Sequence, residues 1–214
     1  MDLGKRRCAG PKNRRSGSTK RDQQSLSILG NNAAVKMNSR MTDVLMRGPA
    51  KLSHELPPDL DQVARAGWAL GPRGAILLKS LWGRGWRTSI DASEVGAYEY
   101  EVNDVYGSLT DLAADQATYL NRAAVRGVSF ATRMLKDAAA LPGADRLTAT
   151  VGISVDEKDE DFFLQGVTIR FFSRRGDYPT WFEDLERYQS EAIAVVDMAD
   201  LAGPDPLAKL LYRK

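Results

Sequence analysis

The sequence predicts an α+β domain with an antiparallel sheet of about four to six strands, two main helices packed on one face, and a disordered basic N-terminal arm. The stretch from Arg146 to Ser173 supports this fold class most clearly. Its first part alternates apolar and small polar residues, as a strand with one buried face does; the apolar positions are Leu147, Ala149, Val151, Ile153 and Val155. Its second part, from Phe162 to Phe172, is aromatic and β-branched. We therefore expect a long antiparallel hairpin.

Between these two runs lies the charged segment Asp156 to Asp161, which holds five carboxylates in six residues. A calcium loop needs ligands at spaced positions and a glycine that turns the chain around the ion, and this segment has neither. The segment is typical of a solvated hairpin tip. Its negative charge would favour a basic partner.

The second observation behind the fold class is an uneven distribution of charge. The first 47 residues contain eleven Lys/Arg and three Asp/Glu, a net charge of +8 in a chain of net +2, so the remainder carries −6. Large apolar side chains are scarce before residue 50. We expect residues 1–50 to form a disordered basic arm, or a leader from a misassigned start, and residues 51–214 to form a single domain.

The first half of that domain is expected to contain two short helices and a second hairpin. Leu60, Val63 and Ala64 share a helical face, and a second helix is expected over residues 75–82 after the break at Gly71-Pro72. The second hairpin is predicted from two short alternating runs and is followed by a short strand at Val105-Tyr106; the alternating residues are Trp86, Thr88 and Ile90, then Tyr98, Tyr100 and Val102.

The two main helices are expected over residues 111–141 and from Thr180 onward. Thr110 or Asp111 can cap the first, and Pro142-Gly143 ends it. The second presents one apolar face that includes Trp181, Leu185, Tyr188, Ala192 and Val195. Residues 192–198 have an alternative interpretation as a last strand, because the run is short and partly β-branched. Residues 207–212 form a final helical turn or two.

Residue counts exclude several kinds of chemistry. Cys8 is the only cysteine and His54 the only histidine, so one chain cannot form a disulfide or a Cys/His zinc site, and we expect no metal and no cofactor. Residues 71–80 resemble a phosphate loop only superficially, because Leu78 stands where the glycine before the lysine should be and no strand is expected before Gly71.

Three functions are compatible with the remaining features, and the leading one is a non-enzymatic protein-binding domain, such as an inhibitor or neutralising partner of a basic protein. Its interface is expected at the junction after the central hairpin, where cations and aromatics gather, since Arg, Tyr and Trp dominate protein–protein hot spots. The residues proposed for this interface are Arg170, Arg174, Arg175, Tyr178 and Phe182.

Nucleic-acid binding through the basic arm is the first alternative, because Lys and Arg neutralise phosphates. Its candidate residues are Lys5, Arg6, Arg7, Lys12, Arg14, Arg15, Lys20 and Arg21. The second alternative is a hydrolase-like enzyme with Glu99 and Glu101 as a carboxylate pair on one strand face, about 6 to 7 Å apart. No apolar run reaches the roughly 18 to 20 residues that span a bilayer, and no secretion signal is recognisable, so a cytoplasmic location is expected.

Overall fold

A computed structural model describes residues 36–212 of the chain, apart from residues 50, 54, 85, 86, 88, 157, 159, 161, 163, 164, 176–178 and 204. The eight basic residues proposed for nucleic-acid binding, Lys5 to Arg21, lie outside the described residues. His54, Trp86, Thr88 and Tyr178 also lie outside them.

The core of the fold is a four-stranded antiparallel sheet with the order β3-β5-β4-β6. Its strands are β3 (Asp104–Gly107), β4 (Leu147–Ser154), β5 (Val167–Ser173) and β6 (Glu191–Asp197). The two central strands form the hairpin expected from the alternating pattern, with Leu147 opposite Ser173 and Ile153 opposite Val167. The α+β class, the antiparallel sheet and the central hairpin are thus confirmed.

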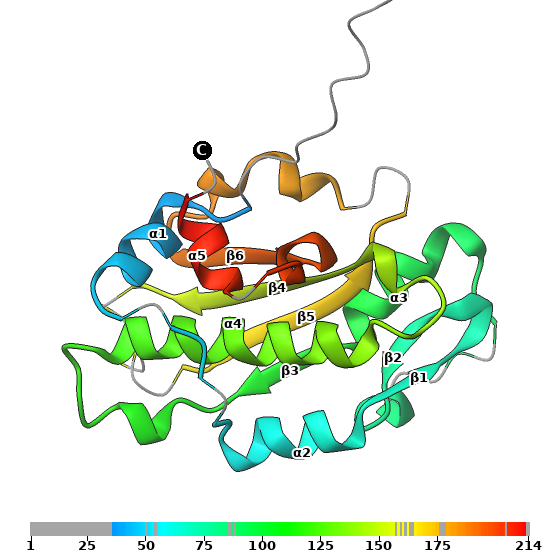
Figure 1. Cartoon of the computed structure of the whole chain (residues 1–214), viewed down its shortest axis with the longest axis horizontal. Coiled ribbons are helices and arrows are strands. Elements are labelled where there is room, and N and C mark those ends of the chain that lie inside the picture. The colour runs from blue at the N-terminus through cyan, green and yellow to red at the C-terminus, as the bar shows by residue number, and fades with distance from the viewer. Residues whose placement is uncertain are drawn as a thin grey trace, which may run out of the picture. The chain divides into compact units, whose positions relative to one another are not determined.

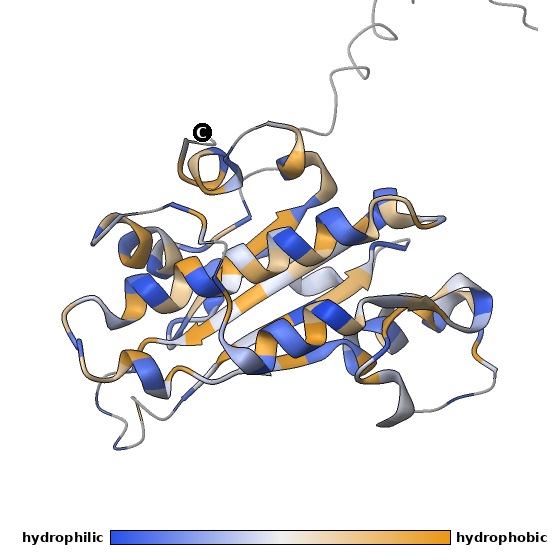
Figure 2. Ribbon diagram, turned by 60° about the horizontal axis from the view of Figure 1, so that its bottom comes forward, coloured by the Kyte–Doolittle hydropathy of each residue, from blue (hydrophilic) through white to orange (hydrophobic). Residues whose placement is uncertain are grey.

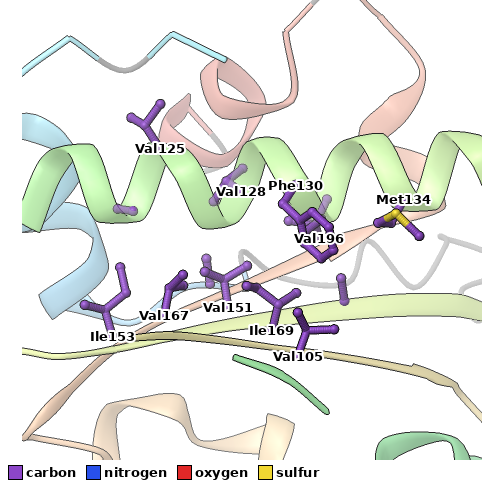
Figure 3. Close-up of a cluster of buried hydrophobic side chains, with 14 of the residues drawn as sticks. Val105, Val125, Val128, Phe130, Met134, Val151, Ile153, Val167, Ile169 and Val196 are labelled. Carbon is purple, nitrogen blue, oxygen red and sulfur yellow. The ribbon is translucent and has the colours of Figure 1, made fainter. Parts of the chain in front are cut away.

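The longest helix, α4 (Tyr119–Ala138), lies along one face of this sheet (Figure 1). Val128, Phe130 and Met134 of the helix pack toward Val151 and Ile169 of the central strands, all fully buried (Figure 3). The helices carry hydrophilic as well as hydrophobic residues along their length (Figure 2). The expected helix therefore exists, although it starts at Tyr119 and only a 3₁₀ turn, Thr110–Leu112, precedes it.

Gly127 marks a close approach of α4 to the sheet. A Cβ atom at this position would lie 2.5 Å from Cγ1 of Val151 and 2.7 Å from Cγ2 of Val167. Gly127→Ala should therefore lower the free energy of unfolding by about 1 to 2 kcal/mol, because overpacking outweighs the gain of about 1 kcal/mol in helix propensity. Chemical denaturation measures this. Gly152→Ala is the control, since a Cβ there meets only Glu191 Oε2, at 3.8 Å; a Gly127→Ala protein as stable as the wild type would contradict the packing.

Helix α1 (Ser39–Met46) belongs to the fold, although it lies within the segment expected to be an arm. Met41, Val44 and Leu45 are buried in the main core. The chain before α1 extends the sheet at β6: the Asn38 N–H donates to the Ile193 carbonyl at 3.0 Å, and the Val195 N–H to the Lys36 carbonyl at 2.5 Å. Residues 36–46 therefore belong to the folded domain, although they precede the boundary expected at residue 50. The helix is too short to form alone, and tertiary packing stabilises it.

The segment after α2 (Pro58–Ala66) forms a small sheet where a second helix was expected. Strands β1 (Trp68–Leu70) and β2 (Ile76–Leu78) pair antiparallel, with Trp68 opposite Leu78. The turn between them has Arg73 at a φ of 56°, in the left-handed region. A strand therefore does precede Gly71, contrary to expectation. It leads into a tight hairpin rather than into a phosphate loop and helix.

The prediction of a second hairpin is also wrong, because residues 95–102 form helix α3 (Val95–Val102). Its buried residues Val95, Tyr98, Glu99 and Val102 follow helical spacing, and Asp91 and Glu94 form a capping box just before it. The short strand expected at Val105-Tyr106 is confirmed as β3.

The second main helix, expected from Thr180, does not form. The chain makes two 3₁₀ turns instead, η7 (Thr180–Glu183) and η8 (Leu185–Arg187), and then β6, which pairs with β4 along its whole length. The alternative of a last strand is thus correct, because the hydrogen bonds that β4 offers outweigh a weak helical pattern. Helix α5 (Pro206–Tyr212) provides the expected final turns.

Candidate binding groove on the open sheet face

The face of the sheet opposite α4 carries the second set of alternating residues, and it is only partly covered. Thr150 and Gly152 of β4 lie beside Thr168 and Arg170 of β5. The segment of η7 and η8 covers the β6 side, where Leu185 packs with Ile193 and Val195. Thr150 is only 6% exposed, so the face expected to be wet is partly buried.

A groove of about 1140 Å³ remains open on this face. It combines aromatic side chains with small polar residues and a few charges, which is a composition typical of binding sites. The residues that line it are Tyr100, Tyr106, Thr150, Gly152, Ile153, Ser154, Asp156, Gln165, Gly166, Thr168, Arg170, Trp181, Tyr188, Ser190, Glu191 and Ile193.

A continuous row of aromatic rings fixes part of the groove wall. The ring centre of Tyr100 lies 5.5 Å from that of Phe172 and 6.2 Å from that of Trp181. The ring centres of Trp181 and Tyr188 are also 6.2 Å apart, and all three pairs are edge to face. Such pairs add about 0.5 to 1.5 kcal/mol each beyond the area that they bury. The wall is therefore held by α3, η7 and the residue after η8 together.

Arg170 enters the groove from β5, and its charge is already compensated. Its guanidinium donates to the Tyr100 hydroxyl and to the Asp104 carboxylate, each at 3.1 Å. It also lies 5.1 Å from the centre of the Tyr100 ring. Arg170 therefore orients Tyr100 as well as offering a partly exposed cation.

The two described arginines of the expected interface, Arg174 and Arg175, do not join Arg170 in the groove. Arg174 donates to the Asp197 carboxylate at 3.0 Å, and neither Arg174 nor Arg175 lines the groove. The side chain of Phe182, like all of Tyr178, lies outside the described part of the chain. The candidate site is therefore the groove on the sheet face and not the junction after β5.

The carboxylate pair proposed for hydrolysis is not formed. Glu99 and Glu101 lie on helix α3, where residues two apart point in different directions. Glu101 is exposed, 3.6 Å from Arg87. Glu99 is fully buried and accepts hydrogen bonds from the backbone N–H groups of Ile76, at 2.8 Å, and Ser173, at 2.5 Å. Burial raises the pKa of its carboxyl, against the lowering effect of these hydrogen bonds.

A second cavity, of about 680 Å³, lies between residues 49–59 and the start of α4. Three of its charged groups are engaged in the fold: Arg126 donates to both carboxylate oxygens of Asp111, at 2.7 and 2.5 Å, and Asp59 accepts from the Ser108 N–H at 3.0 Å. This arrangement explains how residues 108–111 are fastened to α4.

No group of three His, Cys, Asp or Glu side chains among the described residues is placed to hold a metal ion. No helix within the described ranges is long and apolar enough to cross a membrane. The chain matches no protein-family model, no curated protein and no solved structure.

Proposed function

We propose that this protein is a non-enzymatic protein-binding domain and that the groove on the open sheet face receives a segment of its partner. The observation that carries the proposal is the concentration of Tyr100, Tyr106, Trp181 and Tyr188 around one concave surface. Aromatic residues and Arg are enriched at interface hot spots, and such anchors can each supply about 2 kcal/mol or more of binding. Among the described residues of the expected interface, Arg170 is the one that lines this groove.

Nucleic-acid binding through residues 5–21 stays a prediction, as does a cytoplasmic location. The groove itself favours protein over nucleic acid, because its one described cation, Arg170, is paired with Asp104. A phosphate backbone requires free Lys or Arg side chains.

The proposal is tested by placing a photo-crosslinking amino acid at Ser154, which lines the groove, and at Ala140, which is exposed after the end of α4. In cells, we expect one discrete protein adduct from Ser154 and none of the same mass from Ala140. Gly152→Val should abolish the Ser154 adduct, because the added side chain fills the groove floor. Adducts that are the same at both positions, or that survive Gly152→Val, would contradict the groove as the interface.

A further inference from the structure

We infer that the groove recognises a basic, extended segment of its partner by holding a lysine or arginine side chain between the Glu191 carboxylate and the Tyr106 ring. The inference rests on the proposed function and specifies the chemistry of the partner. It depends on three features of the sheet face: a floor of small residues, carboxylates that have no ion-pair partner among the described residues, and an exposed tyrosine that packs on the backbone.

The floor is one row of residues that cross the four strands side by side. Tyr106 is opposite Thr168, Thr168 is opposite Gly152, and Gly152 is opposite Ile193. The two middle positions are small, whereas both ends are large. With strands about 4.8 Å apart, the trough between Tyr106 and Ile193 has room for an extended chain or a long side chain.

Glu191 brings a negative charge onto this floor. It stands opposite Ser154 at the start of β6, and its Oε2 lies 3.8 Å from the position that a Cβ on Gly152 would take. The carboxylate therefore lies beside Gly152, within van der Waals distance of the place where a Cβ would be. Asp156 lines the same end of the groove. Within the described ranges neither carboxylate has an ion-pair partner, while the cation of the groove, Arg170, is bound to Asp104.

Tyr106 lines the same groove from β3, and β5 and β4 separate its strand from that of Glu191. The Tyr106 side chain is 59% exposed, yet its position is fixed, because a Cβ on Gly166 would lie 2.3 Å from two of its ring atoms. The ring thus lies directly against the backbone at Gly166. An exposed aromatic face attracts Lys and Arg, and a neighbouring carboxylate adds to that attraction. The two groups together complement a cation and would repel an acidic segment.

The test uses fluorescently labelled peptides: a short one in which Lys and Arg alternate with Gly and Ser, and a matched one with Gln in place of each Lys and Arg. We expect the full-length protein to bind the basic peptide and not the Gln peptide. Glu191→Gln should weaken binding about threefold to tenfold, and Gly152→Val should weaken it at least as much. Asp137→Asn is the matched control, since it removes one exposed carboxylate from α4 on the other side of the sheet.

The inference is overturned if the basic peptide does not bind, if both peptides bind equally, or if Asp137→Asn weakens binding as much as Glu191→Gln. The last result would mean that net charge alone attracts the peptide, including attraction by the acidic hairpin tip. The Ser154 crosslink separates this failure from that of the proposed function. If the wild-type protein forms a Ser154 adduct that is lost with Gly152→Val but does not bind the basic peptide, the groove is still the interface and the partner is not basic.

Discussion

Phe171→Ala should lower the free energy of unfolding by about 3 to 5 kcal/mol, the cost typical of removing a buried phenyl ring and leaving a cavity. Phe171 is fully buried on the α4 side of β5. Its ring centre lies 5.2 Å from that of Trp68 in β1 and 6.0 Å from that of Phe130 in α4, both edge to face. One side chain therefore joins the small sheet, the long helix and the main sheet.

Urea denaturation of the wild type and the variant measures this loss, with unchanged m-values as the condition for comparing the two. Tyr106→Ala is the control, since it removes an aromatic ring from the neighbouring strand but from an exposed position. We expect it to cost less than about 1 kcal/mol. If the two variants lost equal free energies of unfolding, Phe171 would not be the side chain that joins the small sheet, α4 and the main sheet.

The sequence predicts the central hairpin correctly because the same alternation runs through the whole of both strands. From Leu147 to Ile153 every second residue is buried against α4 or its neighbours, and the pattern has no helical equivalent. In residues 95–102 the alternation of Tyr98, Tyr100 and Val102 is short, and the same residues also fit a helix. The capping box of Asp91 and Glu94 was the signal that could have decided between them.

The candidate site could be predicted only in part, since the groove gathers residues from several separate segments. Arg170 was found because it stands near other cations and aromatics in the sequence. Tyr106 and Glu191 were missed because the strand order places them on one face, although they are far apart in the chain. Nothing local in the sequence specifies that order. Gly166 matters because a Cβ there would clash with the Tyr106 ring, and this role appears only when its neighbours are known.

The buried polar residues of α3 were missed for a similar reason. Asn103 accepts a hydrogen bond from the Leu78 N–H at 2.8 Å, and it donates to the carbonyls of Ile76 at 2.8 Å and Phe171 at 3.1 Å. Together with Glu99, it satisfies backbone groups of β2 on the side away from β1. The side chains of α3 thus take the place that a further strand would occupy between β2 and β5.

Glu99→Ala should consequently destabilise the protein by about 2 to 6 kcal/mol, because it leaves the buried N–H groups of Ile76 and Ser173 without their acceptor, at about 1 to 3 kcal/mol each. Glu101→Ala is the matched control on the same helix. Its side chain is exposed and its contact with Arg87 is long, at 3.6 Å, so we expect a change within about 0.5 kcal/mol. Thermal melts and urea denaturation of both variants measure the difference.

The pH dependence of the Glu99→Ala effect provides a further check. Burial raises the pKa of the Glu99 carboxyl above its ordinary value of 4.5, so the folded protein holds this proton more tightly than the unfolded chain does. The stability that Glu99 contributes is therefore complete below 4.5 and decreases as the pH rises through the raised pKa. The cost of Glu99→Ala should become smaller over that range, while the effect of Glu101→Ala should not follow the same course. Equal costs for the two variants would show that Glu99 does not hold β2 to the main sheet.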